Sequence, residues 1–76
     1  MLISKNEVKL ESLIERHLYE NGCVEANVNI HTEHKDVEMF IKADDKRLTI
    51  SMYDDDFENE DEFYDHVISQ MDKHLK

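Results

Sequence analysis

Apolar and polar residues are arranged along this chain with two different periods, and each period predicts one kind of secondary structure. Near both ends of the chain, apolar residues recur every three or four positions, which is typical of amphipathic helices. In the middle they alternate with polar residues, which is typical of strands with one buried face. The pattern predicts helices over about residues 5–21 and 60–75, and strands over about 24–31, 36–43 and 47–53.

Local signals mark the ends of the first helix. Ser4 and Glu7 have the spacing of a capping box, in which each side chain accepts a hydrogen bond from the other residue's amide. Ile3 and Val8 stand at the positions of a hydrophobic staple. Gly22 suits the left-handed conformation that follows a helix end. We therefore expect the first helix to be capped at both ends.

The last helix carries similar signals. Asn59 and Glu62 form a plausible capping pair, and Asp61 adds the negative charge that a helix amino terminus favours. Lys73 and His74 complement the opposite end of the helix dipole. The apolar stripe of this helix consists of Phe63, Val67, Met71 and Leu75, flanked by Tyr64 and Ile68.

The connections between the strands, at about 31–35 and 44–46, are short enough for hairpins. The chain is therefore predicted to form one α+β domain over residues 1–76, with the order α-β-β-β-α. We expect a three-stranded antiparallel meander with both helices packed on one face. The other face carries polar residues, with Phe40 and Tyr53 as the exceptions.

The negative charge of the chain is concentrated in residues 54–65, DDDFENEDEFYD, where eight of twelve side chains are acidic and none is basic. The whole chain holds 19 acidic and 9 basic residues, for a net charge of −10, so the remainder is nearly balanced. Such charge repels DNA, RNA and anionic lipid. No apolar run approaches the length of a membrane span. We expect basic protein partners, and neither nucleic acid nor membrane.

Metal-binding patterns are weak. His31, Glu33 and His34 lie close together, but no second pair of ligands stands at zinc-site spacing, and a polar hairpin turn with exposed histidines is the favoured interpretation. The acidic segment can be aligned with a calcium loop, yet Asn59 replaces the turn-forming glycine and Asp65 the bidentate glutamate. A metal-dependent regulator that uses the two histidines is a distant alternative.

Catalytic patterns are also weak. Cys23 lies in an acidic chain without an activating base nearby, so a small core-filling thiol is the favoured interpretation, and a single cysteine fits a reducing compartment. The chain has one glycine and hence no glycine-rich phosphate loop. We expect a non-enzymatic protein without cofactor, located in the cytoplasm.

The acidic segment has two interpretations. A solvated, charged helix start would keep a small protein soluble. However, like charges at this density repel one another, and the segment includes Phe57, Phe63 and Tyr64, which suits an interface with an aromatic centre and a charged periphery. Carboxylates on a rigid scaffold can present negative points to Arg and Lys side chains that otherwise bind phosphate. Of the aromatics, helical spacing assigns Phe63 to the core and leaves Phe57 and Tyr64 as contact candidates.

Residues 60–65, EDEFYD, following an amino-terminal helix and a three-stranded meander, resemble the small acidic phage-encoded anti-CRISPR proteins that inhibit type II-A Cas9. In that family an α-β-β-β-α core with an acidic start to its last helix imitates DNA and occupies the PAM-reading site of Cas9 bearing its guide RNA. The resemblance assigns partner contacts to Glu60, Asp61, Glu62 and Asp65. One member of that family is longer than this chain and has an additional helical turn between its last strand and its last helix, which we expect to be absent here. It also has acids in its strand connections, as this chain has at Asp44 and Asp45.

The sequence therefore predicts an inhibitor from a phage or mobile element that mimics nucleic acid and blocks a nucleic-acid-binding protein such as Cas9. The alternative is a small structural or assembly protein, a homodimer that pairs through an edge strand or through Phe40 and Tyr53. The predicted partner-binding residues are Asp54, Asp55, Asp56, Glu58, Glu60, Asp61, Glu62, Tyr64 and Asp65.

Overall fold

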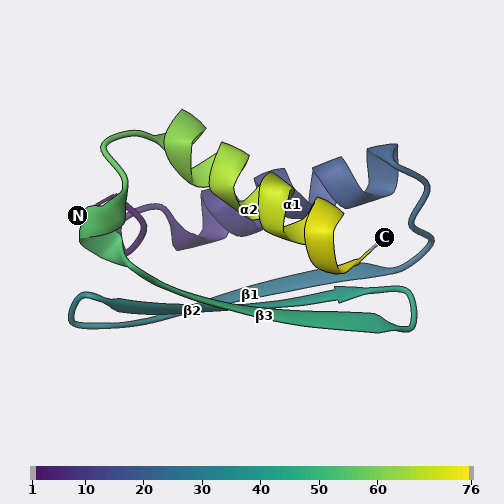
Figure 1. Ribbon diagram of the computed structural model, residues 1–76, viewed down its shortest axis with the longest axis horizontal. Helices are drawn as coiled ribbons and strands as arrows, with labels where there is room; N and C mark the ends of the chain where they lie inside the picture. The colour runs from purple at the N-terminus through teal and green to yellow at the C-terminus, as the bar shows by residue number, and fades with distance from the viewer. Residues whose placement is uncertain (1, 76) are drawn as a thin grey trace.

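The computed structural model describes residues 2–75 and has the predicted order of elements. Three antiparallel strands form one sheet in the order β1-β2-β3, and both helices lie on the same side of it (Figure 1). The α+β prediction is confirmed. The elements are α1 (Glu7–Glu20), β1 (Ala26–Glu33), β2 (Asp36–Ala43), β3 (Lys46–Tyr53), the 3₁₀ turn η1 (Asp54–Asp56) and α2 (Glu60–His74).

The core lies between the helices and the sheet. Both helices bury residues at helical spacing, and the strands bury every second residue, so the two periods of the sequence meet in one apolar layer. The predicted polar face of the sheet is exposed, with Phe40 at 43% and Tyr53 at 59% of their full accessibility. The buried apolar residues are Ile3, Leu10, Ile14, Leu18, Val28, Ile30, Val37, Met39, Ile41, Ala43, Ile50, Met52, Phe63, Val67 and Met71.

Both hairpins turn through two residues. Glu33 pairs with Asp36, and Ala43 pairs with Lys46, so only positions 34–35 and 44–45 connect the strands. The first residue of each turn has a positive φ, 57° at His34 and 55° at Asp44. Two-residue hairpins need this left-handed conformation because it matches the twist of the strands.

The first strand is displaced from its predicted position by two residues. It was expected over 24–31, but β1 begins at Ala26, and Val24 is 85% exposed. The reason is a contact across the end of the sheet, where Asp44 Oδ1 accepts hydrogen bonds from the amides of Val24 and Glu25, both at 2.9 Å. Residues 24 and 25 are thereby held as a connection, and the alternation continues to Glu33.

The predicted start of the first helix is wrong in detail. The amino-terminal cap residue is Asn6, and no side chain caps the helix there. Instead of closing a capping box with Ser4, Glu7 turns to the sheet and accepts a hydrogen bond from the Thr32 hydroxyl at 2.6 Å. Val8 is 76% exposed, so no hydrophobic staple forms. Tertiary contacts therefore replace the local capping that the sequence suggested.

Two other helix-end predictions are confirmed. Gly22 follows α1 with a φ of 96°, the left-handed conformation expected of a glycine at that position. Asn59 caps α2 through its Oδ1, which accepts a hydrogen bond from the Glu62 amide at 2.9 Å. These ends depend on residues close in sequence, which is why local patterns identified them.

Candidate protein-binding surface

The three aspartates of η1 stand side by side in the sequence but differ in environment. The Asp54 amide donates to the Lys35 carbonyl at 2.8 Å, which extends the pairing of β2 and β3 by one residue. Its side chain is only 2% exposed, and Oδ1 accepts a hydrogen bond from the Ile3 amide at 2.8 Å. Asp54 therefore holds the segment before α1 against the core. Its prediction as a partner contact is corrected, because the carboxylate is buried.

The neighbouring aspartates are exposed, and each has a local role. Asp56 Oδ2 accepts a hydrogen bond from the Tyr53 amide at 3.0 Å and so stabilises the 3₁₀ turn. Asp55 lies 3.0 Å from Lys35 Nζ. The hydrogen bond and the negative charge of Asp55 raise the pKa of Lys35 above its ordinary 10.5. The segment is thus folded onto β2 and β3, and the helical turn that we expected to be absent before the last helix is present as η1.

The start of α2 holds the remaining acids of the run. Glu62 Oε2 accepts a hydrogen bond from the Glu58 amide at 2.9 Å, and Glu60 forms an ion pair with Lys9 at 2.9 Å. Within residues 2–75 the exposed carboxylates of Glu58, Asp61 and Asp65 accept no hydrogen bond and form no ion pair. Within the acidic run, those three carboxylates are therefore available to contact a cation of another molecule.

The aromatic residues of the run face inward. Phe63 is fully buried, as predicted, and Phe57 packs edge-on against it with ring centroids 5.6 Å apart. Tyr64 is partly buried, and its hydroxyl lies 2.9 Å from Nδ1 of His17 on α1. Phe57 and Tyr64 therefore connect elements within the protein, but both are only partly buried, so their contact with a partner stays a prediction. The exposed aromatic ring nearest to the acidic run is that of Tyr53.

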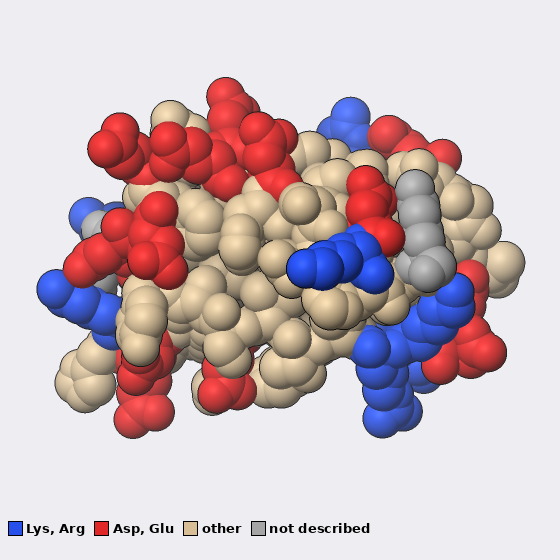
Figure 2. Space-filling model, viewed as in Figure 1, with Lys and Arg blue, Asp and Glu red and all other residues tan. Residues whose placement is uncertain are grey.

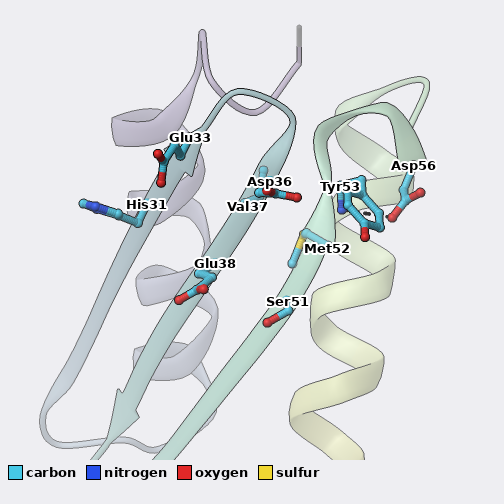
Figure 3. A pocket seen from close by; sticks show the side chains of 9 residues that line it. All are labelled: His31, Glu33, Asp36, Val37, Glu38, Ser51, Met52, Tyr53 and Asp56. Carbon is cyan, nitrogen blue, oxygen red and sulfur yellow. Dashed lines mark hydrogen bonds between the residues drawn. The ribbon is translucent and has the colours of Figure 1, made fainter.

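A groove of about 390 Å³ on the open face of the sheet continues the acidic surface (Figure 3). Sequence reasoning missed it. The β1–β2 hairpin brings Glu33, Asp36 and Glu38 to the end of the sheet where β3 meets η1, because Asp36 pairs with Tyr53 in the antiparallel register. The strand pattern contained the signal, but only the register shows that these acids and the acidic run share one end. The groove is lined by His31, Glu33, Asp36, Val37, Glu38, Ser51, Met52, Tyr53 and Asp56.

We refer to the exposed and partly exposed acids at this end of the molecule as the acidic end. They come from the β1–β2 hairpin, from η1 and from the start of α2. Figure 2 shows many carboxylates there with some Lys or Arg side chains among them, whereas a larger group of Lys and Arg side chains, also with carboxylates nearby, lies at the opposite end beside the β2–β3 hairpin. Asp44 and Asp45 lie in that distant hairpin and are not part of the surface. The acidic end consists of Glu33, Asp36, Glu38, Asp55, Asp56, Glu58, Glu60, Asp61, Glu62 and Asp65.

The acidic end can bind cations that a partner supplies. In residues 2–75, no group of three or more His, Cys, Asp and Glu side chains is arranged to hold a metal ion. Cys23 is partly buried and packs against the core. Exposed carboxylates beside the ring of Tyr53 are suited to guanidinium and ammonium groups, through charge-assisted hydrogen bonds and cation–π contact.

Comparison of the chain with known protein families, with curated proteins and with solved structures finds no match. Among the helices of the described residues, none has both the length and the apolar character that crossing a membrane requires.

Proposed function

We propose that this protein is a non-enzymatic inhibitor that imitates nucleic acid and occupies the basic surface of a nucleic-acid-binding protein. One observation carries the proposal. Carboxylates from three separate segments are held at one end of a folded scaffold, while most bases lie elsewhere. A solubility role needs no such grouping, because interspersed charges serve it at lower self-repulsion.

The arrangement of the carboxylates supports recognition of a phosphate-binding surface. Asp55 and Asp56 project from η1, which is tied to β2 and β3 by backbone and side-chain hydrogen bonds. Glu58 and Asp61 follow within one capped helix start. Since these elements are fixed to one another, the negative points keep a constant spacing, which lowers the ordering cost on binding. Arg and Lys side chains that bind successive phosphates are the expected counterparts.

The first target to test is Cas9 bearing its guide RNA, since the resemblance of residues 60–65 points there. In this proposal the protein acts in the cytoplasm of a host cell, as the product of a phage or mobile element. It competes with target DNA for the Arg side chains that read the PAM, so inhibition follows from occupancy alone. The turn η1 lies before α2, at the place of the additional helical turn in that family, although from the sequence we expected this turn to be absent.

Charge reversal at the acidic end tests the proposal. The double variant Glu58→Lys with Asp61→Lys changes two exposed carboxylates that have no internal partner. The matched control, Glu25→Lys with Asp45→Lys, gives the same net charge but alters exposed acids away from the acidic end. We expect the first variant to bind Cas9 and guide RNA roughly 100-fold more weakly and the control to bind within a few-fold of wild type.

Two further measurements separate the possible failures. Equilibrium binding at low and high salt should show a steep loss of affinity with salt, since exposed charges are screened. A capture experiment from host lysate identifies other salt-sensitive partners. If Cas9 is not bound but another nucleic-acid enzyme is, Cas9 is rejected as the target, and the proposal of nucleic-acid mimicry stands. If the first variant and the control bind any basic partner with equal affinity, nucleic-acid mimicry by this surface is rejected.

A further inference from the structure

The two edges of the sheet differ in how their backbone groups are satisfied. At the β1 edge, side chains of α1 reach over and accept hydrogen bonds from the outward amides. Glu15 Oε1 accepts from Val28 at 3.1 Å, and Glu11 Oε2 accepts from Ile30 at 2.7 Å. An edge whose amides are occupied by carboxylates is closed to another strand. The β1 edge is therefore protected by the protein itself.

The β3 edge is open. The Asp54 amide donates inward to Lys35, whereas the Tyr53 amide donates outward to Asp56, so odd-numbered amides of β3 face away from β2. Those of Arg47, Thr49 and Ser51 accordingly point out of the sheet. No residue in the described part of the chain accepts a hydrogen bond from these three amides. A row of free amides on an edge strand is a template for strand pairing.

We propose that β3 pairs antiparallel with β3 of a second copy, about a two-fold axis at Ile50. In this register Thr49 lies opposite Ser51 of the second copy, and Arg47 lies opposite Tyr53 of the second copy. The free amides of Thr49 and Ser51 in each strand then find a backbone carbonyl in the other strand, whereas the outward amide of Tyr53 keeps its hydrogen bond to Asp56. The result is a continuous six-stranded sheet, with the two helix layers on the same side. The argument for this pairing does not rest on the proposed function, although both use the exposed ring of Tyr53.

Charge and side-chain complementarity select a second copy as the partner. The strand begins with Lys46 and Arg47 and leads into the aspartates of η1, so an antiparallel two-fold places the basic end of one copy beside the acidic turn of the other. Arg47 forms no ion pair with any residue between 2 and 75, and it would lie against the exposed ring of Tyr53 in the second copy. Thr and Ser hydroxyls opposite each other add a favourable cross-strand pair.

Sedimentation velocity over a range of concentrations tests the pairing. Thr49→Pro removes one outward amide, and an edge strand tolerates proline where the amide faces solvent. Thr49→Val keeps that amide and the branched shape, and serves as the matched control. We expect wild type and Thr49→Val to dimerise and Thr49→Pro to dimerise at least tenfold more weakly. A wild-type protein that stays monomeric throughout, or a folded Thr49→Pro that dimerises normally, overturns the proposal.

Crosslinking tests the register and does not depend on how Thr49→Pro folds. In a Cys23→Ser background, one chain carries Thr49→Cys and the other Ser51→Cys. We expect mild oxidation to crosslink the mixture of the two chains several-fold more than either chain alone, because positions 49 and 51 face each other across the axis. Preferential crosslinking of either variant to itself would place the axis elsewhere and overturn the proposed register.

Discussion

Replacing Asp54 with alanine should lower the free energy of unfolding by about 2 kcal/mol. Its Oδ1 accepts a hydrogen bond from the Ile3 amide at 2.8 Å, and the variant leaves that buried donor without an acceptor. A buried polar group left unpaired costs roughly 1–3 kcal/mol. Within residues 2–75 the second oxygen of Asp54 has no hydrogen-bond partner, so removing it relieves an unfavourable burial and keeps the net loss near the middle of that range.

The assay is urea unfolding followed by far-ultraviolet circular dichroism, together with hydrogen exchange of the Ile3 amide. At roughly 4–8 °C for each kcal/mol in a domain of this size, the expected loss corresponds to a fall in Tm of roughly 8–16 °C. In the wild type the Ile3 amide should exchange slowly, and in the variant it should exchange quickly. Asp54→Asn keeps an oxygen acceptor in the same place and should lose less stability than Asp54→Ala.

Asp55→Ala is the matched control, because it removes the same charge from the next residue. Its carboxylate is exposed and pairs only with an exposed lysine, so we expect no resolvable change in unfolding free energy. An Asp54→Ala protein as stable as the wild type, with slow exchange at Ile3, would refute the structural role of Asp54. A larger loss in Asp55→Ala than in Asp54→Ala would refute the division of the aspartates into buried and exposed.

Two further variants test the connections that organise the fold. Replacing both Glu11 and Glu15 with alanine removes the acceptors of the Val28 and Ile30 amides. We expect the free energy of unfolding to fall by about 2–4 kcal/mol and hydrogen exchange at those two amides to become faster. Unchanged exchange would contradict their protection by α1. Asn59→Ala removes the α2 cap and should cost about 1 kcal/mol, measured by urea unfolding; Asn59→Asp retains the acceptor oxygen and should keep most of this stability.

The sequence predicted features that depend on residues near one another in the chain. The periods of two and of three to four identified α1, α2 and the strands β1, β2 and β3, because burial on one face imposes that spacing wherever the element lies; the short turn η1 has no such period and was missed. The cap at Asn59 and the left-handed Gly22 are local geometry and were recognised for the same reason. Local signals failed at Glu7 and Val24, because each bonds to a residue distant in the chain. The Glu7 carboxylate accepts a hydrogen bond from Thr32, and the Val24 amide donates one to Asp44.

The candidate surface was predictable only in part. The charge of residues 54–65 is visible in the sequence, and so is the exposure expected of Glu58 and Asp61. Composition gave no means to separate Asp54 from Asp55, since the two have the same side chain and adjacent positions. Their difference arises because β3 ends beside the segment before α1, which directs one carboxylate inward and the other to solvent.

By itself the sequence determined the class of fold, the apolar faces that form the core, and the location of most of the negative charge along the chain. The tertiary structure alone decided which carboxylates are free to meet a partner, that Glu33, Asp36 and Glu38 join them, and that only the β3 edge is open in the described residues. The physical reason is the separation along the chain of the residues that each interaction joins. Periodicity and capping act between neighbours in the chain, whereas burial of a charge and occupation of a sheet edge depend on residues brought together by folding.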